Sequence, residues 1–205
     1  MDPSAPDLER RLPPERPAAR EVLAGAMQRV GLLETPVPAA AERWIETFLD
    51  AFTDRLPSLH AALEEVGALR AEAVTLPALE LERLRNREVL FFLDAVAQYV
   101  DDQPELRALP LERDLPAIAD EFGIAHADAL AAVRMALTGT AEGPPLALLF
   151  PLLGHERIMI RIGAVSSHIL HGRGLEPIRF GPGGTPFETI HGARPPATGD
   201  PARES

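Results

Sequence analysis

Three arginines in the C-terminal half of the chain are the residues best suited to bind a ligand. Arg134, Arg157 and Arg161 stand in a stretch that is punctuated by glycine and proline. A guanidinium group can bind a phosphate through two parallel hydrogen bonds and can stack on a nucleobase, which suits contacts with a nucleic acid. The same side chains could instead cap helix ends and pair with Glu156 and neighbouring acids. The residues alone leave both roles open.

Helical spacing and glycine positions predict the elements that come before Arg157. Apolar residues recur at helical spacing ahead of Gly139, at Leu130, Val133 and Leu137. A helix is therefore expected to end at Thr138, because glycine adopts the left-handed conformation of a helix end at little cost. Gly143 and Pro144 mark the following loop, and a short helix is expected to run from there to Gly154. Its apolar face is formed by Leu146, Leu149, Phe150 and Leu153.

A last helix is expected to begin at His155. Its apolar stripe consists of Ile158, Ile162, Val165 and Ile169. Arg157 and Arg161 are four residues apart and fall together on a flank of this stripe. The sequence therefore predicts a compact helical module with arginines on its rim.

Other chemistries lack a complete set of residues. The chain has no Cys, and all 20 of its basic residues are Arg, which excludes disulfides, zinc-thiolate sites, cysteine nucleophiles and lysine-dependent nucleotide signatures. His168 and His171 are one helical turn apart with His155 upstream, a spacing that could serve a metal ion but is also typical of solvated histidines. The GPGG segment at 181–184 is better explained as a flexible linker than as a phosphate nest, because no helix or lysine follows it. We expect no catalytic residues, no metal site and no cofactor.

The distribution of charge restricts how a nucleic acid could bind. The formal net charge is -11, so the chain as a whole repels phosphates at long range. The segment 155–194 differs, because it holds five Arg against three Glu. Any RNA binding must therefore depend on local clusters of arginine, and an acidic solvated surface without a nucleic-acid role is the alternative.

The remainder of the chain predicts an all-α fold. A length of 205 residues with 46% apolar residues is enough for one domain or two small helical subdomains. Amphipathic segments recur with Gly or Pro at their ends, and none alternates as a strand would. Trp44, Phe48 and Phe52 share one apolar stripe and are expected in the core rather than as a platform for stacking bases. Another helix is expected before Gly67 with Ser58 as its N-cap. We expect a bundle of about eight helices in total.

Composition divides the chain into four parts. A Pro-rich, charged start predicts a disordered lead-in, and a Gly/Pro-rich end predicts a flexible tail. Between them, a boundary between two helical subdomains is expected around 101–110. The four parts are 1–17, 18–103, 104–170 and 171–205. No apolar run approaches the roughly 20 residues that span a bilayer, and the N-terminus lacks the apolar centre of a signal peptide, so a cytoplasmic protein without membrane contacts is expected.

The order of residues from Arg134 to Arg161 resembles the anticodon-binding, C-terminal helical domain of glutamyl-tRNA synthetases, which belong to the class I aminoacyl-tRNA synthetases. In that family an arginine precedes ALTG, and a Gly-Pro turn, a Leu-Gly pair and a Glu-Arg-rich helix follow. The chain keeps Arg134, Ala136, Leu137, Thr138, Gly139, Gly143, Pro144, Leu153, Gly154, Glu156, Arg157 and Arg161. Less specific similarity extends the resemblance to roughly residues 20–165. It implies that Gly139, Gly143, Pro144 and Gly154 form a structural motif and that the three arginines contact RNA.

Two departures from the family bear on activity. The HIGH and KMSKS signatures of the family's nucleotide-binding catalytic domain are absent from this chain. Catalysis by this chain alone is therefore not expected, although the family's activity is that of a glutamate-tRNA ligase. At His155 the family often places a lysine, so a fixed charge is replaced by a side chain that is mostly neutral at pH 7.

The resemblance implies a tRNA-binding module, with glutamate tRNA as the candidate partner, that acts in aminoacylation for translation without catalysis of its own. Two alternatives stay open. One is a protein-interaction module derived from that domain, docking on a synthetase or on another protein. The other is one piece of a split glutamate-tRNA ligase, in which the partner would be a separate synthetase catalytic half.

Overall fold

A computed structural model of the protein describes residues 11–77, 82–103 and 105–171. Within these ranges the chain is helical and forms no strand, so the all-α prediction is confirmed. In chain order the helices are α1 (Arg16–Arg29), α2 (Ala39–Phe52), α3 (Leu59–Arg70), α5 (Arg87–Asp101), the 3-10 helix η1 (Leu106–Ala108), α6 (Leu111–Glu121), α7 (His126–Thr138) and α8 (Leu146–His171). The first ten residues of the expected lead-in, and the expected tail beyond His171, lie outside the described residues.

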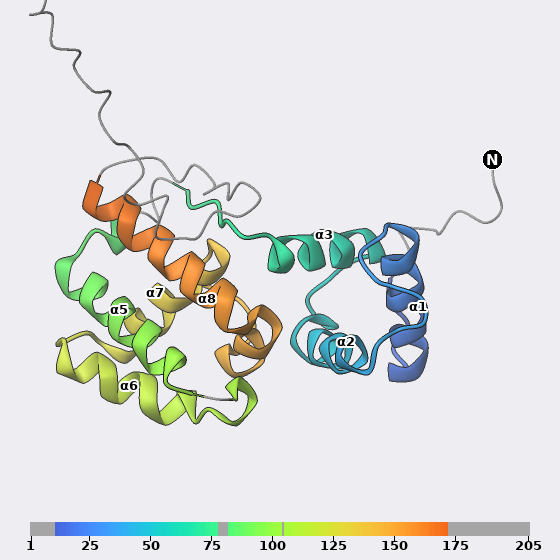
Figure 1. The fold of residues 1–205 in the computed structure, drawn as a ribbon, viewed down its shortest axis with the longest axis horizontal. Helices are drawn as coiled ribbons and strands as arrows, with labels where there is room; N and C mark the ends of the chain where they lie inside the picture. Colours follow the sequence, from blue (N-terminus) through green and yellow to red (C-terminus); the bar gives the residue numbers. More distant parts are fainter. Residues whose placement is uncertain (1–10, 78–81, 104, 172–205) are drawn as a thin grey trace, which may run out of the picture.

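The helices form two groups that lie side by side. Helices α1, α2 and α3 make the N-terminal group, and α5, α6, α7 and α8 make the C-terminal group (Figure 1). The two meet where α2 and the end of α3 pack on α8. Buried side chains of both groups belong to one continuous apolar core, in which Phe48 of α2 and Phe150 of α8 are fully buried. We refer to the contact region between the groups as the junction.

The division between the groups differs from the boundary expected around 101–110. Helix α5 had been expected in the N-terminal subdomain, but it packs against α6, α7 and α8. Its buried face includes Leu93, Val96 and Val100. The division therefore lies between the end of α3 and the start of α5. An amphipathic pattern predicts that a helix buries one face, but it does not identify the helix that covers that face.

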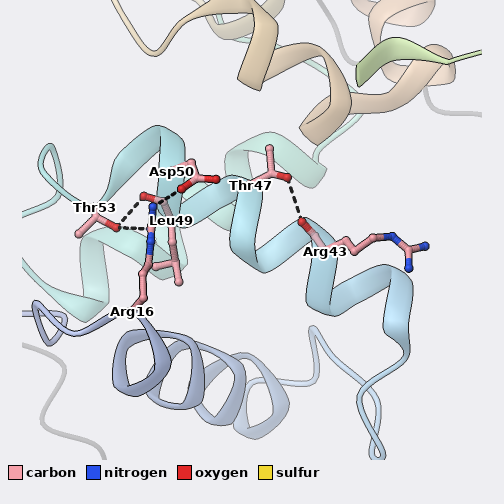
Figure 2. A network of polar contacts seen from close by, with 6 residues as sticks. All are labelled: Arg16, Arg43, Thr47, Leu49, Asp50 and Thr53. Carbon is pink, nitrogen blue, oxygen red and sulfur yellow. Dashed lines mark hydrogen bonds and ion pairs between the residues drawn. The ribbon is translucent and has the colours of Figure 1, made fainter. Parts of the chain in front are cut away.

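Helix α1 begins earlier than expected. Residues up to 17 were assigned to the disordered lead-in, yet the helix starts at Arg16. The guanidinium of Arg16 pairs with the carboxylate of Asp50 and donates a hydrogen bond of 3.2 Å to Thr53 Oγ1, both at the end of α2 (Figure 2). These contacts fix the first turn of α1 against α2. The Pro-rich composition of the segment gave no sign of this partner.

Two of the three aromatic residues of α2 lie in the core as predicted, and the third, Trp44, lies at its edge. The ring centroids of Trp44 and Phe48 are 5.5 Å apart, and those of Phe48 and Phe52 are 4.9 Å apart. Phe48 and Phe52 are buried, while Trp44 remains partly exposed at the junction.

Helix α3 carries the chain to the junction. Ser58 caps its N-terminus as predicted, because the hydroxyl oxygen accepts a hydrogen bond of 3.2 Å from the amide of Ala61. The helix continues through Gly67 to Arg70, further than expected, since Leu69 is buried in the core and extends its apolar face. The last carbonyl groups of α3 are thereby brought against α8.

Candidate nucleic-acid interface

The glycines of the C-terminal stretch shape its backbone as the sequence predicts. Helix α7 ends at Thr138, and Gly139 follows with a φ of 83°. Helix α8 is interrupted at Gly154, whose φ of 76° and ψ of 164° are not helical. The apolar face expected before Gly154 is buried, at Leu146, Leu149, Phe150 and Leu153. Pro144 is also buried, and Gly143 lies beside the side chain of Arg134.

Arg161 lies in the interior and not on the rim. The side chain is 2% exposed, which makes it one of the largest fully buried residues in the described part of the chain. One terminal nitrogen, Nη1, donates to the carbonyl of Leu137 in the last turn of α7. The other, Nη2, donates to the carbonyls of Ala68 at 2.7 Å, Leu69 at 3.2 Å and Ala71 at 2.6 Å, at the end of α3. The expected position on an exposed flank is therefore corrected.

The ends of two helices explain why a charge is stable in this position. The last carbonyls of a helix have no partner within the helix, and they form the negative end of its dipole. The pKa of Arg161 is lowered to about 10, first by burial and then by the nearby Arg157, while Glu65 opposes both effects. The guanidinium is thus still charged at neutral pH. In the opposite sense, burial raises the pKa of Glu65, while Arg161 lowers it.

Arg157 lies closer to solvent, one turn before Arg161. Its Nε donates a hydrogen bond of 3.1 Å to the carbonyl of Arg70, and its Nη1 makes a longer bond of 3.4 Å to the carbonyl of Leu153. The Arg70 side chain, exposed at the end of α3, donates to the carbonyl of Leu32. Arg70 and Arg157 therefore stand next to each other, although they belong to different helix groups.

A groove of about 520 Å³ runs beside these two arginines. It lies between the loop after α1, the start of α2 and the interruption of α8, and we refer to it as the junction groove. Its walls include Leu32, Leu33, Trp44, Leu152, Gly154 and Arg157, together with Arg70. Glu34 is the acidic residue in this lining. The volume falls in the range of about 300–1,000 Å³ that is usual for pockets holding small ligands.

Arg134 lies apart from the junction groove. Its Nε donates a hydrogen bond of 3.3 Å to the carbonyl of Pro144, and the side chain is half-buried. It lines a different hollow of about 300 Å³, together with Leu115 and Leu130. The structure thus brings Arg157 and Arg161 together but does not bring Arg134 to them.

Four arginines of the junction donate to backbone carbonyls, and in one case also to a hydroxyl, but not to carboxylates. In the part of the chain that the structure describes, Arg70, Arg107, Arg157 and Arg161 have no acidic partner within 4.0 Å. Arg107 of η1 bonds the carbonyl of Arg43 at 3.2 Å and the hydroxyl of Thr47 at 3.0 Å on α2. By contrast, Arg20 on α1 pairs with Glu46 at 3.2 Å. These four arginines at the junction are therefore not paired with carboxylates of the described residues, although Glu65 lies near enough to Arg161 to affect its pKa.

Two of the three histidines considered as a metal site, His155 and His168, lie far apart on α8. His155 is half-buried, and its Nε2 lies 2.7 Å from the carbonyl oxygen of Gln103. His168 is about 20 Å further along α8, given the rise of an α-helix. It is buried, whereas the sequence favoured a solvated position. The side chain of His171 lies outside the described residues.

Arg70 and Arg107 were missed by sequence reasoning. Arg70 stands in the last turn of α3, where a basic residue interacts favourably with the helix dipole. That position was the one feature of the sequence that could have drawn attention to it. Arg107 gave no signal, because its partners on α2 are 60 and 64 residues away.

No helix in the described ranges is both long enough and apolar enough to cross a membrane.

Comparison with known proteins identifies the family. A family model described as the anticodon binding domain matches residues 19–165. The chain is 22% identical over 122 residues to glutamate-tRNA ligase 2 of Caldanaerobacter subterraneus subsp. tengcongensis, which covers 60% of this chain and 25% of the relative. It is 23% identical over 137 residues to glutamate-tRNA ligase of Moorella thermoacetica, with 66% of this chain and 28% of the relative covered.

The fold is similar to that of a solved glutamate tRNA ligase from Elizabethkingia meningosepticum, with a TM-score of 0.59 and 13% identity over 73% of this chain and 29% of that one. The chain thus spans about a quarter of the length of the curated relatives that it matches. Because the family model covers most of the chain, including both helix groups and the arginine motif, the protein belongs to the anticodon binding domain family.

Proposed function

We propose that the chain binds tRNA at the junction groove and that Arg70 and Arg157 contact the phosphate backbone. The observation that carries the proposal is that Arg70 and Arg157, the two arginines in the lining of this groove, have no ion-pair partner among the described residues. A guanidinium that is not neutralised by a carboxylate retains its attraction for phosphate even on an acidic protein. Membership of the anticodon binding domain family supports tRNA as the nucleic acid, and the names of the relatives support glutamate tRNA.

The groove also suits an unstacked base. Single-stranded loops expose bases that proteins hold against apolar and aromatic side chains. Leu33 and Trp44, both partly exposed, provide such surfaces in the lining of the groove. The role proposed for the chain is therefore binding and positioning of tRNA in aminoacylation for translation, with the acylation chemistry supplied by a catalytic domain.

The three arginines predicted from the sequence then have separate roles. Arg157 contacts RNA directly. Arg161 contributes indirectly, by holding the ends of α3 and α7 in place. Its guanidinium is buried beneath the surface, and its terminal nitrogens already donate to backbone carbonyls. Arg134 is retained as a second RNA contact outside the groove, which an Arg134→Ala variant tests separately.

A salt titration with matched variants tests the proposal. Binding of glutamate tRNA and of unrelated tRNA is measured for the unmodified chain, for an Arg70→Ala/Arg157→Ala variant and for an Arg16→Ala/Arg20→Ala control. Both variants lose two charges, but the control arginines lie on α1 and pair with Asp50 and Glu46 of α2. The junction variant is expected to bind more weakly and to lose about 0.7–0.9 from the salt slope for each lost phosphate contact.

Two results would overturn the proposal. Equal weakening in both variants would show that binding follows net charge and not the groove. If the unmodified chain retains no tRNA at near-physiological salt, the groove proposal fails; capture of a complete synthetase or of another protein would then support the protein-interaction alternative, and capture of a separate catalytic half would support the split ligase.

A further inference from the structure

The segment that connects the two helix groups is held by residues of the C-terminal stretch. The connector leaves α3 after Arg70 and passes over the end of α7. A Cβ atom added at Gly139 would lie 2.6 Å from the carbonyl oxygen of Thr75 and 3.1 Å from Cγ1 of Val74. Since real Cβ atoms do not approach a backbone oxygen so closely, the absence of a side chain at Gly139 allows the connector to pack directly on the α7 backbone.

Arg161 holds the start of the same connector. Its Nη2 donates to Ala71, the first residue of the connector, and to the end of α3, while its Nη1 donates to the end of α7. One buried guanidinium therefore joins a helix end from the N-terminal group to a helix end from the C-terminal group. The two terminal nitrogens diverge, and a lysine ammonium, which is a single point charge, cannot reproduce this geometry.

We propose that Gly139 and Arg161 form a latch that clamps the connector at 71–75 and fixes the N-terminal helix group against the C-terminal one. The latch is a property of the protein without RNA and does not depend on the proposed function. Its consequence for binding does rest on that function. Because Arg70 and Trp44 come from one group and Arg157 comes from the other, the shape of the junction groove depends on the latch.

Two glycines with a positive φ provide a matched pair of variants. Gly139 and Gly123 have φ values of 83° and 68°, so alanine is strained at both. A Cβ at Gly123 meets no atom within 4 Å, whereas a Cβ at Gly139 collides with the connector. Gly139→Ala therefore tests the latch, and Gly123→Ala controls for backbone strain. Arg161→Lys tests the second half of the latch while preserving charge.

The distance between the groups is measured by energy transfer between labels. The chain has no cysteine, so Glu21→Cys on α1 and Glu121→Cys on α6 give two unique sites, both exposed. We expect a narrow distance distribution in the parent and in Gly123→Ala, and a broader one in Gly139→Ala and Arg161→Lys. Amide exchange at Ala71, whose N–H bonds the carbonyl of Gly67, is expected to accelerate at least tenfold in the latch variants only.

A distribution in Gly139→Ala that matches Gly123→Ala would overturn the latch. So would a broad distribution in the parent, a measurement that stays informative if a latch variant fails to fold. The tRNA titration is run on the same proteins. If the latch variants broaden the distance distribution but bind tRNA normally, the latch stands and the groove proposal fails.

Discussion

The indole nitrogen of Trp44 donates a hydrogen bond of 2.9 Å to the carbonyl oxygen of Leu152, and so joins α2 to the first half of α8. The two residues are 108 positions apart in the sequence and form two walls of the junction groove. This bond crosses between the helix groups in a partly buried position, whereas Arg161 crosses between them in the interior.

Trp44→Phe is expected to lower the free energy of unfolding by about 1–2 kcal/mol. Phenylalanine keeps the aromatic ring but leaves the carbonyl of Leu152 without its donor, and an unpaired carbonyl in a partly buried position carries a cost of this order. Urea unfolding followed by far-UV circular dichroism gives the measurement. An unchanged midpoint and slope would show that water replaces the indole without loss.

Arg161→Met is expected to lower the free energy of unfolding by at least about 2 kcal/mol, because carbonyls at the ends of α3 and α7 lose their donor. Methionine fills a similar volume, so the effect reports on hydrogen bonds and not on a cavity. Arg157→Met serves as the comparison and should be less damaging, since that side chain is half-buried. A more stable Arg161→Met protein, as is seen when some buried ion pairs are replaced by apolar residues, would contradict this expectation.

Tyr99 is expected to titrate with a pKa of about 12, above its ordinary value of 10.0. Burial is the largest cause, and a hydrogen bond of 2.7 Å from the phenol to Asp114 adds to it. Since the folded state favours the neutral phenol, this group's contribution to stability is complete below pH 10 and is lost as the pH rises towards 12.

The Tyr99 titration can be read directly from the ultraviolet absorbance of tyrosinate, because the chain has one tyrosine. Asp114→Asn should bring the pKa down without restoring the ordinary value, since burial remains. A pKa at the ordinary value in the unmodified protein would mean that the phenol is not held against Asp114 in solution.

Ser58→Ala is expected to lower the free energy of unfolding by about 1 kcal/mol, because the Ala61 amide at the start of α3 loses its acceptor. Ser58→Gly should lower it by only a few tenths of a kcal/mol, since glycine is tolerated at the N-cap. Thermal unfolding of both variants decides the point. A larger loss for glycine than for alanine would assign the effect to chain flexibility and not to the cap.

Much of the local structure follows from the sequence. The ends of α7 and of the first half of α8 were predicted from Gly139 and Gly154, because each glycine follows an apolar face with helical spacing. The core position of Phe48 and Phe52 was predicted from the stripe that they form on α2. These features depend on residues close together in the chain, and their physical causes act over one or two helical turns.

The position of Arg161 could not be predicted in the same way. Helical spacing places it on a flank of its own helix, but it does not show that the ends of α3 and α7 cover that flank. The option of capping a helix end was recognised for the arginines, and Arg161 takes it at two helices at once. The packing of α5 escaped prediction for the same reason, since its apolar face fits more than one partner.

The hydrogen bonds of Arg161 also govern how the protein unfolds. If either helix group opened alone, the guanidinium would lose carbonyl partners on one side while remaining enclosed on the other. The continuous core would at the same time expose apolar surface between α2 and α8. We therefore expect the two groups to unfold as one cooperative unit in a single transition. A chain divided between α3 and α5 would give two fragments that do not fold separately.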